Sequence, residues 1–212
     1  MKRFCNHLIA RMIDGRRQSG KYAVDKQSIA APSSAESICK PLLGRQSDPM
    51  AQIPFVHLRT FSAYTILDGA MEPAAIGPAA KERGFPAVAL CDRIGLFASM
   101  AFDDGCRANG VQPITGCFLR IARPGSADPS KPALDWIALY AQDAEGYENL
   151  CKLVSASHLD RPSELEAHVG MDFVGDHSAG LIALTGGGEG AVARLIAEEQ
   201  QFEAEAYLSL LQ

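Results

Sequence analysis

Short apolar runs alternate with stretches of helical spacing from Phe55 to the end of the chain. Strand-like runs cover residues 55–59, 86–91, 112–122, 135–141 and 180–187. Helical spacing covers residues 72–84, 95–110 and 143–159 and the segment from Glu189 onward, whereas residues 160–178 show no clear period. Pro73 suits a first helical turn and Gly84 a helix C-terminus. This alternation predicts an α/β fold with a parallel sheet, or a parallel β/α barrel with its helices outside.

Functional side chains in such folds gather at the carboxyl ends of the strands. A hydrolytic metal centre at that edge needs several His and carboxylate side chains from different strands. The strand ends offer one His and two Asp, because the other four His, at positions 7, 158, 168 and 177, fall in the N-terminal segment, a helix end and loops. The candidate positions are His57, Arg59, Phe61, Asp68, Asp92, Arg93, Cys117, Phe118, Trp136 and Thr185. This set offers few ligands for a metal site.

Charge divides the chain into two segments. The 212 residues suit one ordinary domain plus a tail, or a fragment of a larger protein, and a hydrophobic content of 47% with 21% charged residues indicates a folded protein. Residues 1–50 carry nine Lys or Arg against four acids, a net +5, while residues 51–212 carry eleven against twenty-one, a net -10. We therefore predict a basic, disordered N-terminal extension over residues 1–50 and a folded domain over 51–212. Met50, just before the motif-bearing sequence, is a candidate natural start.

The composition also indicates a cellular compartment. The apolar runs are shorter than the roughly 20 residues that a membrane span needs, and no signal-peptide pattern opens the chain. A transit peptide is disfavoured by the acids among the first 50 residues. Six cysteines show no CxxC spacing, which favours reduced thiols in a cytoplasm. Buried apolar thiols are the preferred interpretation over nucleophiles, because no His lies at a suggestive position nearby.

Five collinear segments carry a family resemblance. They read FVHLRTFSAYTILDGA, GFPAVALCDRIGLFASMAF, VQPITGCFLRI, DAEGYENLCKLVSASHLDRP and GLIALTGGGEGAVARL. Over about residues 54–211 their order and spacing resemble the N-terminal polymerase and histidinol phosphatase (PHP) domain of bacterial DNA polymerase III alpha subunits. The resemblance implies a distorted parallel β/α barrel of the PHP type, here incomplete at its C-terminal end. It also implies a much longer parent chain, whose polymerase palm would hold Mg²⁺.

The metal-binding pattern of this family matches only in part. His57 and Asp68 match the first motif and Asp92 matches the second. Five positions that carry metal ligands in metal-competent members have other side chains here, namely Arg59, Phe61, Arg93, Phe118 and Trp136. Arg, Phe and Trp supply no lone pair to a divalent ion. The resemblance therefore implies a vestigial site without a metal or other cofactor.

The two arginines suggest what replaces the metal. We expect the guanidinium groups of Arg59 and Arg93 to lie where the ion would be and to offset Asp68 and Asp92, because an unpaired buried carboxylate is costly. The simpler alternative is that Asp68 caps a turn before Gly69, Asp92 starts a loop, and both arginines are solvated. The run TGGGEG, residues 185–190, lacks both phosphate-loop spacings, so a glycine turn between strand and helix is expected.

Function follows from the resemblance and the charge. A net -10 over residues 51–212 disfavours a DNA-binding surface. The resemblance implies a scaffold that packs against the rest of the polymerase alpha subunit and docks the proofreading exonuclease subunit of the replicase holoenzyme, in a chain that does not polymerise DNA by itself. Two rivals stay open: a free-standing metal-dependent phosphoesterase using His57, Asp68 and Asp92, and a truncated product without function.

Overall fold

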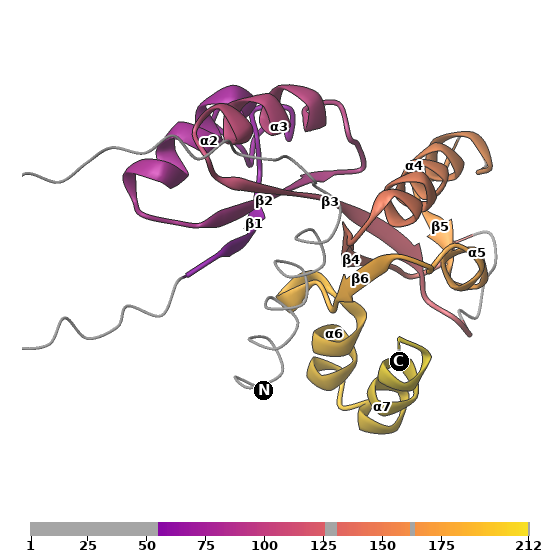
Figure 1. The fold of residues 1–212 in the computed structure, drawn as a ribbon. Helices are drawn as coiled ribbons and strands as arrows, with labels where there is room; N and C mark the ends of the chain where they lie inside the picture. Colours follow the sequence, from indigo (N-terminus) through magenta and orange to yellow (C-terminus); the bar gives the residue numbers. More distant parts are fainter. Residues whose placement is uncertain (1–54, 126–130, 162–163, 212) are drawn as a thin grey trace, which may run out of the picture. The chain divides into compact units, whose positions relative to one another are not determined.

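The structure is a computed structural model and describes residues 55–125, 131–161 and 164–211. The predicted N-terminal extension over residues 1–50 lies outside the described residues. The described elements are β1 His57–Thr60, α2 Pro73–Glu82, β2 Ala87–Arg93, α3 Ser99–Ala108, β3 Gln112–Ala122, β4 Leu134–Ala141, α4 Ala144–Leu159, β5 Val169–Gly170, α5 Met171–Asp176, β6 Leu181–Leu184, a 3-10 turn η1 Gly187–Glu189, α6 Ala191–Ala197 and α7 Gln201–Leu210. Figure 1 shows their arrangement.

The predicted alternation of strands and helices is confirmed, with differences at three places. Pro73 opens α2, and Gly84, with φ of +72°, follows its end, as the sequence predicted. The segment without a clear period contains the short strand β5 and the helix α5. The last helical segment is two helices rather than one, because Glu199 adopts a positive φ of 60° between α6 and α7. Helix α3 begins at Ser99, four residues later than the spacing predicted.

The sheet is mostly parallel, with one reversed strand. The strand order is β1-β2-β3-β4-β6, and β5 pairs with the far end of β3. Strands β1, β2 and β3 are parallel, as predicted, whereas β4 runs antiparallel to both β3 and β6. The prediction of a parallel sheet is therefore wrong for β4. A parallel return needs a crossover of about a dozen residues or more, usually a helix, and the connection 123–133 is too short for one.

The reversal of β4 decides what meets at one edge of the sheet. The first residues of β4 lie beside the last residues of β3, with Trp136 opposite Arg120. The start of β4 therefore lies at the same edge as the carboxyl ends of the parallel strands. The Tyr140 hydroxyl donates a hydrogen bond of 2.6 Å to the Leu58 carbonyl oxygen, which joins β4 to β1 even though β2 and β3 separate them in the strand order.

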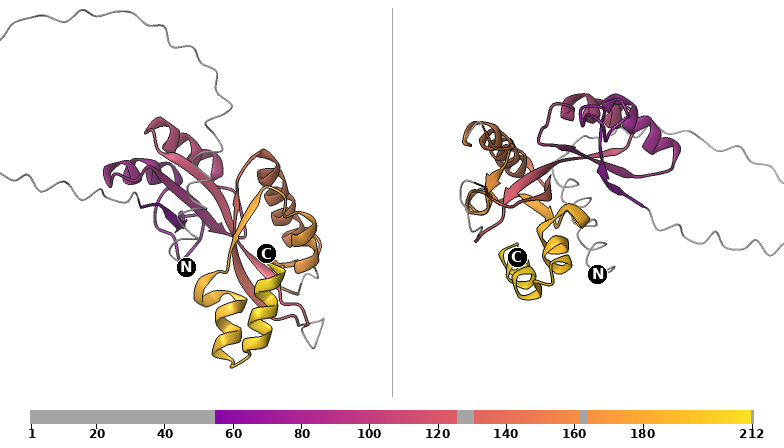
Figure 2. Two further views of the ribbon diagram at one scale, coloured as in Figure 1. Left: turned by 60° about the horizontal axis from the view of Figure 1, so that its bottom comes forward. Right: turned by 180° about the vertical axis from the view of Figure 1, so that it is seen from behind.

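Helices α2 and α3 lie side by side and cover the β1–β3 part of the sheet (Figure 1 and Figure 2). A Cβ added to Gly77 would lie 2.4 Å from the Gly105 carbonyl oxygen, so only glycine permits this close approach of the helices. Their buried side chains, including Ile76 and Phe102, pack on Leu90 of β2. This packing holds β2 in place, and β1 pairs with β2. These two strands carry Arg59 and Arg93.

A second core lies between the β3–β4 pair and α4. Leu150 and Leu153 of α4 are fully buried against Leu119 and Leu139. Asp143 caps the N-terminus of α4 by accepting a hydrogen bond of 2.8 Å from the Gly146 backbone amide. No helix in the described part of the chain is long and apolar enough to cross a bilayer.

Candidate functional site

Five of the sequence-predicted positions meet at the carboxyl edge of the parallel strands. Arg59 comes from β1, Phe61 directly follows it, Arg93 ends β2, Phe118 lies in β3 and Trp136 in β4. We call these five residues the Arg–aromatic cluster. They are the same five positions at which the family resemblance implied lost metal ligands.

The aromatic rings form a stacked platform. The rings of Phe118 and Trp136 are nearly parallel, with an interplanar angle of 4° and centroids 4.9 Å apart. The Phe61 ring lies 6.1 Å from that of Phe118. Phe118 is fully buried and Trp136 is 8% exposed. The burial of these two rings contributes free energy through both apolar area and ring stacking.

Guanidinium groups lie over this platform. The Arg59 Cζ atom is 4.3 Å from the centroid of Phe118, and the Arg93 Cζ atom is 4.5 Å from the centroid of Trp136. A third guanidinium, from Arg120, lies 4.4 Å from Trp136. Each distance is within the range in which the negative face of an aromatic ring attracts a cation. Cation–π contacts with the aromatic rings therefore hold Arg59 and Arg93 in place, in addition to their hydrogen bonds.

Two carboxylates neutralise these arginines. Arg93 Nε donates to Asp68 Oδ2 at 2.7 Å, and Arg93 Nη2 donates to Glu189 Oε1 at 2.9 Å. The other oxygen of Glu189 accepts a hydrogen bond from Arg59 Nη2. Glu189 thus bridges the two guanidinium groups. Burial alone would raise the pKa of Glu189, but the hydrogen bonds and charges of Arg93 and Arg59 outweigh it and hold this pKa below its ordinary value.

Asp92 does not pair with an arginine in the way the sequence suggested. Its carboxylate is 4% exposed and accepts three hydrogen bonds, from the Ser62 backbone amide and hydroxyl, both at 2.6 Å, and from the Thr65 hydroxyl at 2.7 Å. Neutral donors in the turn after β1 therefore satisfy this acid. The expected offset by arginine holds for Asp68, which pairs with Arg93, and is wrong for Asp92.

His57 packs among aromatic rings. The imidazole is exposed at the start of β1 and makes edge contacts with the rings of Phe55 and Phe85, at centroid distances of 4.7 and 4.9 Å. Among residues 55–125, 131–161 and 164–211, no group of three or more His, Cys, Asp and Glu side chains is arranged to hold a metal ion.

Sequence reasoning missed Glu189, which the glycine turn places in the site. Gly186 has a φ of +76°, and a Cβ added there would lie 2.1 Å from the Trp136 carbonyl oxygen. The turn therefore packs directly on the backbone of β4, as only glycine permits. The sequence carries a signal for this role, since Glu189 is an acid inside a strand-end loop, but the glycines around it predict only a turn.

These residues do not fit a divalent metal. Two guanidinium groups, which carry only hydrogen-bond donors and stay charged, lie where ligands would converge. The carboxylates that remain are engaged, Asp68 by Arg93 and Asp92 by Ser62 and Thr65. We therefore derive no metal-dependent step at this site.

Three of the described cysteines, Cys91, Cys106 and Cys117, are not placed for nucleophilic chemistry. Cys91 and Cys106 are fully buried, and burial raises the pKa of their thiols to about 12 and about 11 respectively. Burial also raises the pKa of Cys117. Because the thiolate is the reactive form, these thiols behave as small apolar core groups.

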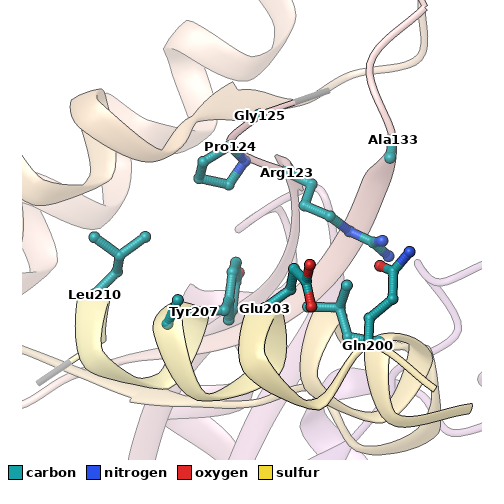
Figure 3. Close-up of a pocket in the computed structure, with 10 residues that line it drawn as sticks. Arg123, Pro124, Gly125, Ala133, Gln200, Glu203, Tyr207 and Leu210 are labelled. Atoms are coloured by element: carbon teal, nitrogen blue, oxygen red, sulfur yellow. The ribbon is translucent and has the colours of Figure 1, made fainter. Parts of the chain in front are cut away.

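A cavity of ≈500 Å³ lies elsewhere, against α7 (Figure 3). Arg123 extends over it toward Gln200, while Tyr207 and Glu203 face it from the helix. Arg123 forms an ion pair with Asp135, with its Nε 2.7 Å from Asp135 Oδ2. Burial raises the pKa of Tyr207 to about 12, so its hydroxyl stays protonated at neutral pH. Neither Arg123 nor Tyr207 is therefore placed to act as a base or nucleophile in this cavity.

Comparison with known proteins gives a family and several relatives. The PHP domain family matches residues 57–212. A DNA polymerase III subunit alpha from Caulobacter vibrioides is 39% identical over 156 residues, which cover 73% of this chain and 14% of the relative. That of Treponema pallidum is 30% identical over 162 residues, covering 74% and 14%. The chain thus spans a small part of the length of the curated relatives it matches.

Similarity to solved structures is weaker. An amidohydrolase from Chromobacterium violaceum, solved with bound sulfate and no metal, has a TM-score of 0.35 and 14% identity, covering 48% of this chain and 34% of that one. This TM-score is too low to support an argument. The family match, in contrast, extends over most of the chain and over every described element. The chain belongs to the PHP domain family.

Proposed function

We propose that residues 57–211 form a metal-independent PHP domain that acts as a scaffold and docking module of a replicative DNA polymerase of the DNA polymerase III alpha type. DNA-directed DNA synthesis is then the activity of the longer parent protein, whose palm would use Mg²⁺. The partners are the rest of the alpha subunit and the proofreading exonuclease subunit of the replicase, in the cytoplasm. The identity of 39% and 30% to two alpha subunits, over 73% and 74% of this chain, supports this assignment.

One observation carries the metal-independent part of this proposal. Arg59 and Arg93 lie over the Phe118 and Trp136 rings and share Glu189, and Asp68 also pairs with Arg93. Two cations and two carboxylates therefore occupy the site. A metal ion would add charge beside two fixed guanidinium groups and would have to displace them. The site residues thus stabilise the strand ends rather than activate water.

The charge of the domain supports a protein-binding rather than a DNA-binding role. Residues 51–212 have a net charge of -10, counted as eleven Lys or Arg against twenty-one Asp or Glu. A surface that follows phosphates is expected to be basic. We infer that this domain makes no direct contact with nucleic acid.

The experiment contrasts this function with a metal-dependent phosphoesterase. The purified chain is incubated with an aryl phosphate and added manganese, beside its His57→Ala variant. The proposal predicts no hydrolysis above the buffer rate for either protein. Turnover by the wild-type chain that is lost in His57→Ala would contradict it, because that result requires His57 in a working metal centre.

A further inference from the structure

Two loops at the carboxyl edge of the parallel strands expose large apolar side chains. In the turn after β1, Ile66 is 80% exposed and Leu67 is 98% exposed, and Tyr64 is also exposed. In the segment after β2, Phe97 is 77% exposed, and Met100, in the first turn of α3, is 74% exposed. Single exposed apolar residues are ordinary, but five large ones in two segments that follow adjacent strands are typical of an interaction surface. We call these five residues the strand-end patch.

Hydrogen bonds hold the turn after β1 against the end of β2 and tie the segment after β2 to β3. The Thr65 hydroxyl donates to Asp92 Oδ1 at 2.7 Å and accepts from the Arg93 backbone amide at 3.1 Å. The Ile94 amide donates to the Phe118 carbonyl oxygen at 2.9 Å, which ties the second loop to β3. Because β1 and β2 are adjacent and parallel, both loops leave the sheet at the same edge. The patch is therefore built on a fixed base.

The backbone is strained at this same place. Leu67 has a φ of 78° and Ile94 a φ of 53°, and they are two of only three described non-glycine residues with a positive φ. Such conformations cost free energy for branched side chains and persist where surrounding contacts impose them. The Leu67 side chain is almost fully exposed. Hydrogen bonds from the Asp68 and Gly69 backbone amides to the Thr65 carbonyl oxygen close the turn around Leu67, and the turn holds this apolar side chain in solvent.

Acidic residues flank the patch. Asp104 lies one helical turn after Met100 on α3 and is exposed, and Glu72 is exposed where the turn after β1 meets α2. Asp68 directly follows Leu67, although Arg93 neutralises it. Apolar side chains with an acidic border are complementary to an apolar surface bordered by Lys or Arg.

We propose that the strand-end patch is the docking surface for a separate protein subunit whose contact region has apolar side chains flanked by Lys and Arg. This inference rests on the docking role proposed above and assigns it a location. Leu67 and Phe97 are the central contacts, and Asp104 contributes a charged border that favours association.

The experiment measures binding of the full chain to the proofreading exonuclease subunit encoded in the same genome. Titration calorimetry compares the wild-type chain with Leu67→Ser, Phe97→Ser and Asp104→Lys. Phe202→Ser on α7 is the matched control, because Phe202 is 86% exposed but lies outside the patch. Trp136 fluorescence verifies that each variant is folded. Each serine variant is expected to weaken binding about tenfold or more, as loss of a central contact does. Asp104→Lys is expected to weaken binding most at low salt, and the control is expected to bind as the wild type does.

The other outcomes overturn the inference in distinguishable ways. If the wild-type chain binds the subunit and the patch variants bind equally well, the docking role stands and the location is wrong. If the wild-type chain does not bind the subunit, the docking role itself fails together with the location. Self-association of the wild-type chain in sedimentation velocity that the serine variants abolish would assign the patch to a second copy of this chain. Chemical cross-links from the patch to residues 1–50 would assign it to the basic segment of the same chain. Either result contradicts a separate partner subunit.

Discussion

Arg59 and Glu189 lie 130 residues apart in the sequence and form an ion pair. Arg59 belongs to β1 and Glu189 follows β6, and these strands are the two ends of the strand order. The pair therefore joins the two ends of an open sheet at the edge where the parallel strands finish. A metal ion bound by several strand ends would make the same kind of connection. In this chain, side chains from the two ends of the sheet make it directly.

Glu189→Gln is expected to destabilise the domain by about 1 kcal/mol at neutral pH, because the bridge to Arg59 and Arg93 is partly exposed and partly screened by solvent. Urea unfolding measures the change, and high salt is expected to reduce it. Glu203→Gln on α7 is the control, since this exposed acid forms no ion pair with any residue that the structure describes. Equal stability of both variants would show that the bridge contributes nothing.

Acid is expected to remove the contribution of Glu189. The pKa of Glu189 is lower in the folded state than its ordinary value of 4.5, so its ionised form stabilises the fold. The contribution is complete above the ordinary pKa and is lost as the pH falls through the folded-state pKa. The stability difference between wild type and Glu189→Gln is therefore expected to be constant from pH 7 to about 5 and to shrink below that. A difference that grows on acidification would contradict this sign.

Gly190→Ala and Gly188→Ala test whether the glycine turn positions Glu189. A Cβ at Gly190 would lie 1.6 Å from the Thr185 carbonyl oxygen, whereas a Cβ at Gly188 would meet nothing within 4 Å. Gly190→Ala is expected to cost about 2 kcal/mol or more in unfolding free energy, as other forced contacts in packed regions do. Gly188→Ala is expected to be neutral or to stabilise by about 0.5 kcal/mol, because alanine restricts the unfolded chain. Equal costs for the two substitutions would exclude close packing of the turn as the reason for its glycines.

Asp92→Ala is expected to cost about 3 kcal/mol, because it leaves the buried hydroxyls of Ser62 and Thr65 and one backbone amide without their acceptor. Asp104→Ala, at an exposed position, is expected to change stability by less than about 0.5 kcal/mol. Thermal unfolding of both variants provides the comparison. An Asp92→Ala variant as stable as the wild type would mean that other groups or water replace the carboxylate.

Trp136 is the single tryptophan of the chain, so its fluorescence reports on the Arg–aromatic cluster alone. Arg93→Ala removes a guanidinium 4.5 Å from the ring and is expected to change the emission intensity and wavelength of the native protein. Arg107→Ala on α3, whose guanidinium pairs with Asp103, is expected to leave the emission unchanged. Identical spectra for wild type and Arg93→Ala would place Arg93 away from the ring in solution.

The sequence predicted much of the fold because apolar periodicity is a local property. The helices α2 and α4 and the buried strands β2 and β3 follow directly from their spacing and from Pro73 and Gly84. The direction of β4 depends on the length of the connection 123–133 and on pairing with β3, which periodicity does not contain. Strand β5 has two residues, too few to show any period.

The sequence predicted which residues lie in the site, but it predicted less well which acid pairs with which arginine. Strand-end positions brought Arg59, Phe61, Arg93, Phe118 and Trp136 together, and these are the residues of the Arg–aromatic cluster. Which acid pairs with which arginine depends on loop conformations. Ser62 and Thr65 reach Asp92 before any arginine does, and the glycine turn delivers Glu189 from a distant segment.

The central claim is that Arg59, Arg93 and Glu189 replace a metal ion rather than accompany one. The most direct measurement is the metal content of the purified chain, determined by elemental mass spectrometry. The chain is first exposed to zinc or manganese, and free ions are removed by gel filtration. The expected result is far less than one ion per chain, with an unfolding temperature unchanged by a chelator. A stoichiometry near one ion per chain, together with a chelator-induced drop in unfolding temperature, would contradict the claim.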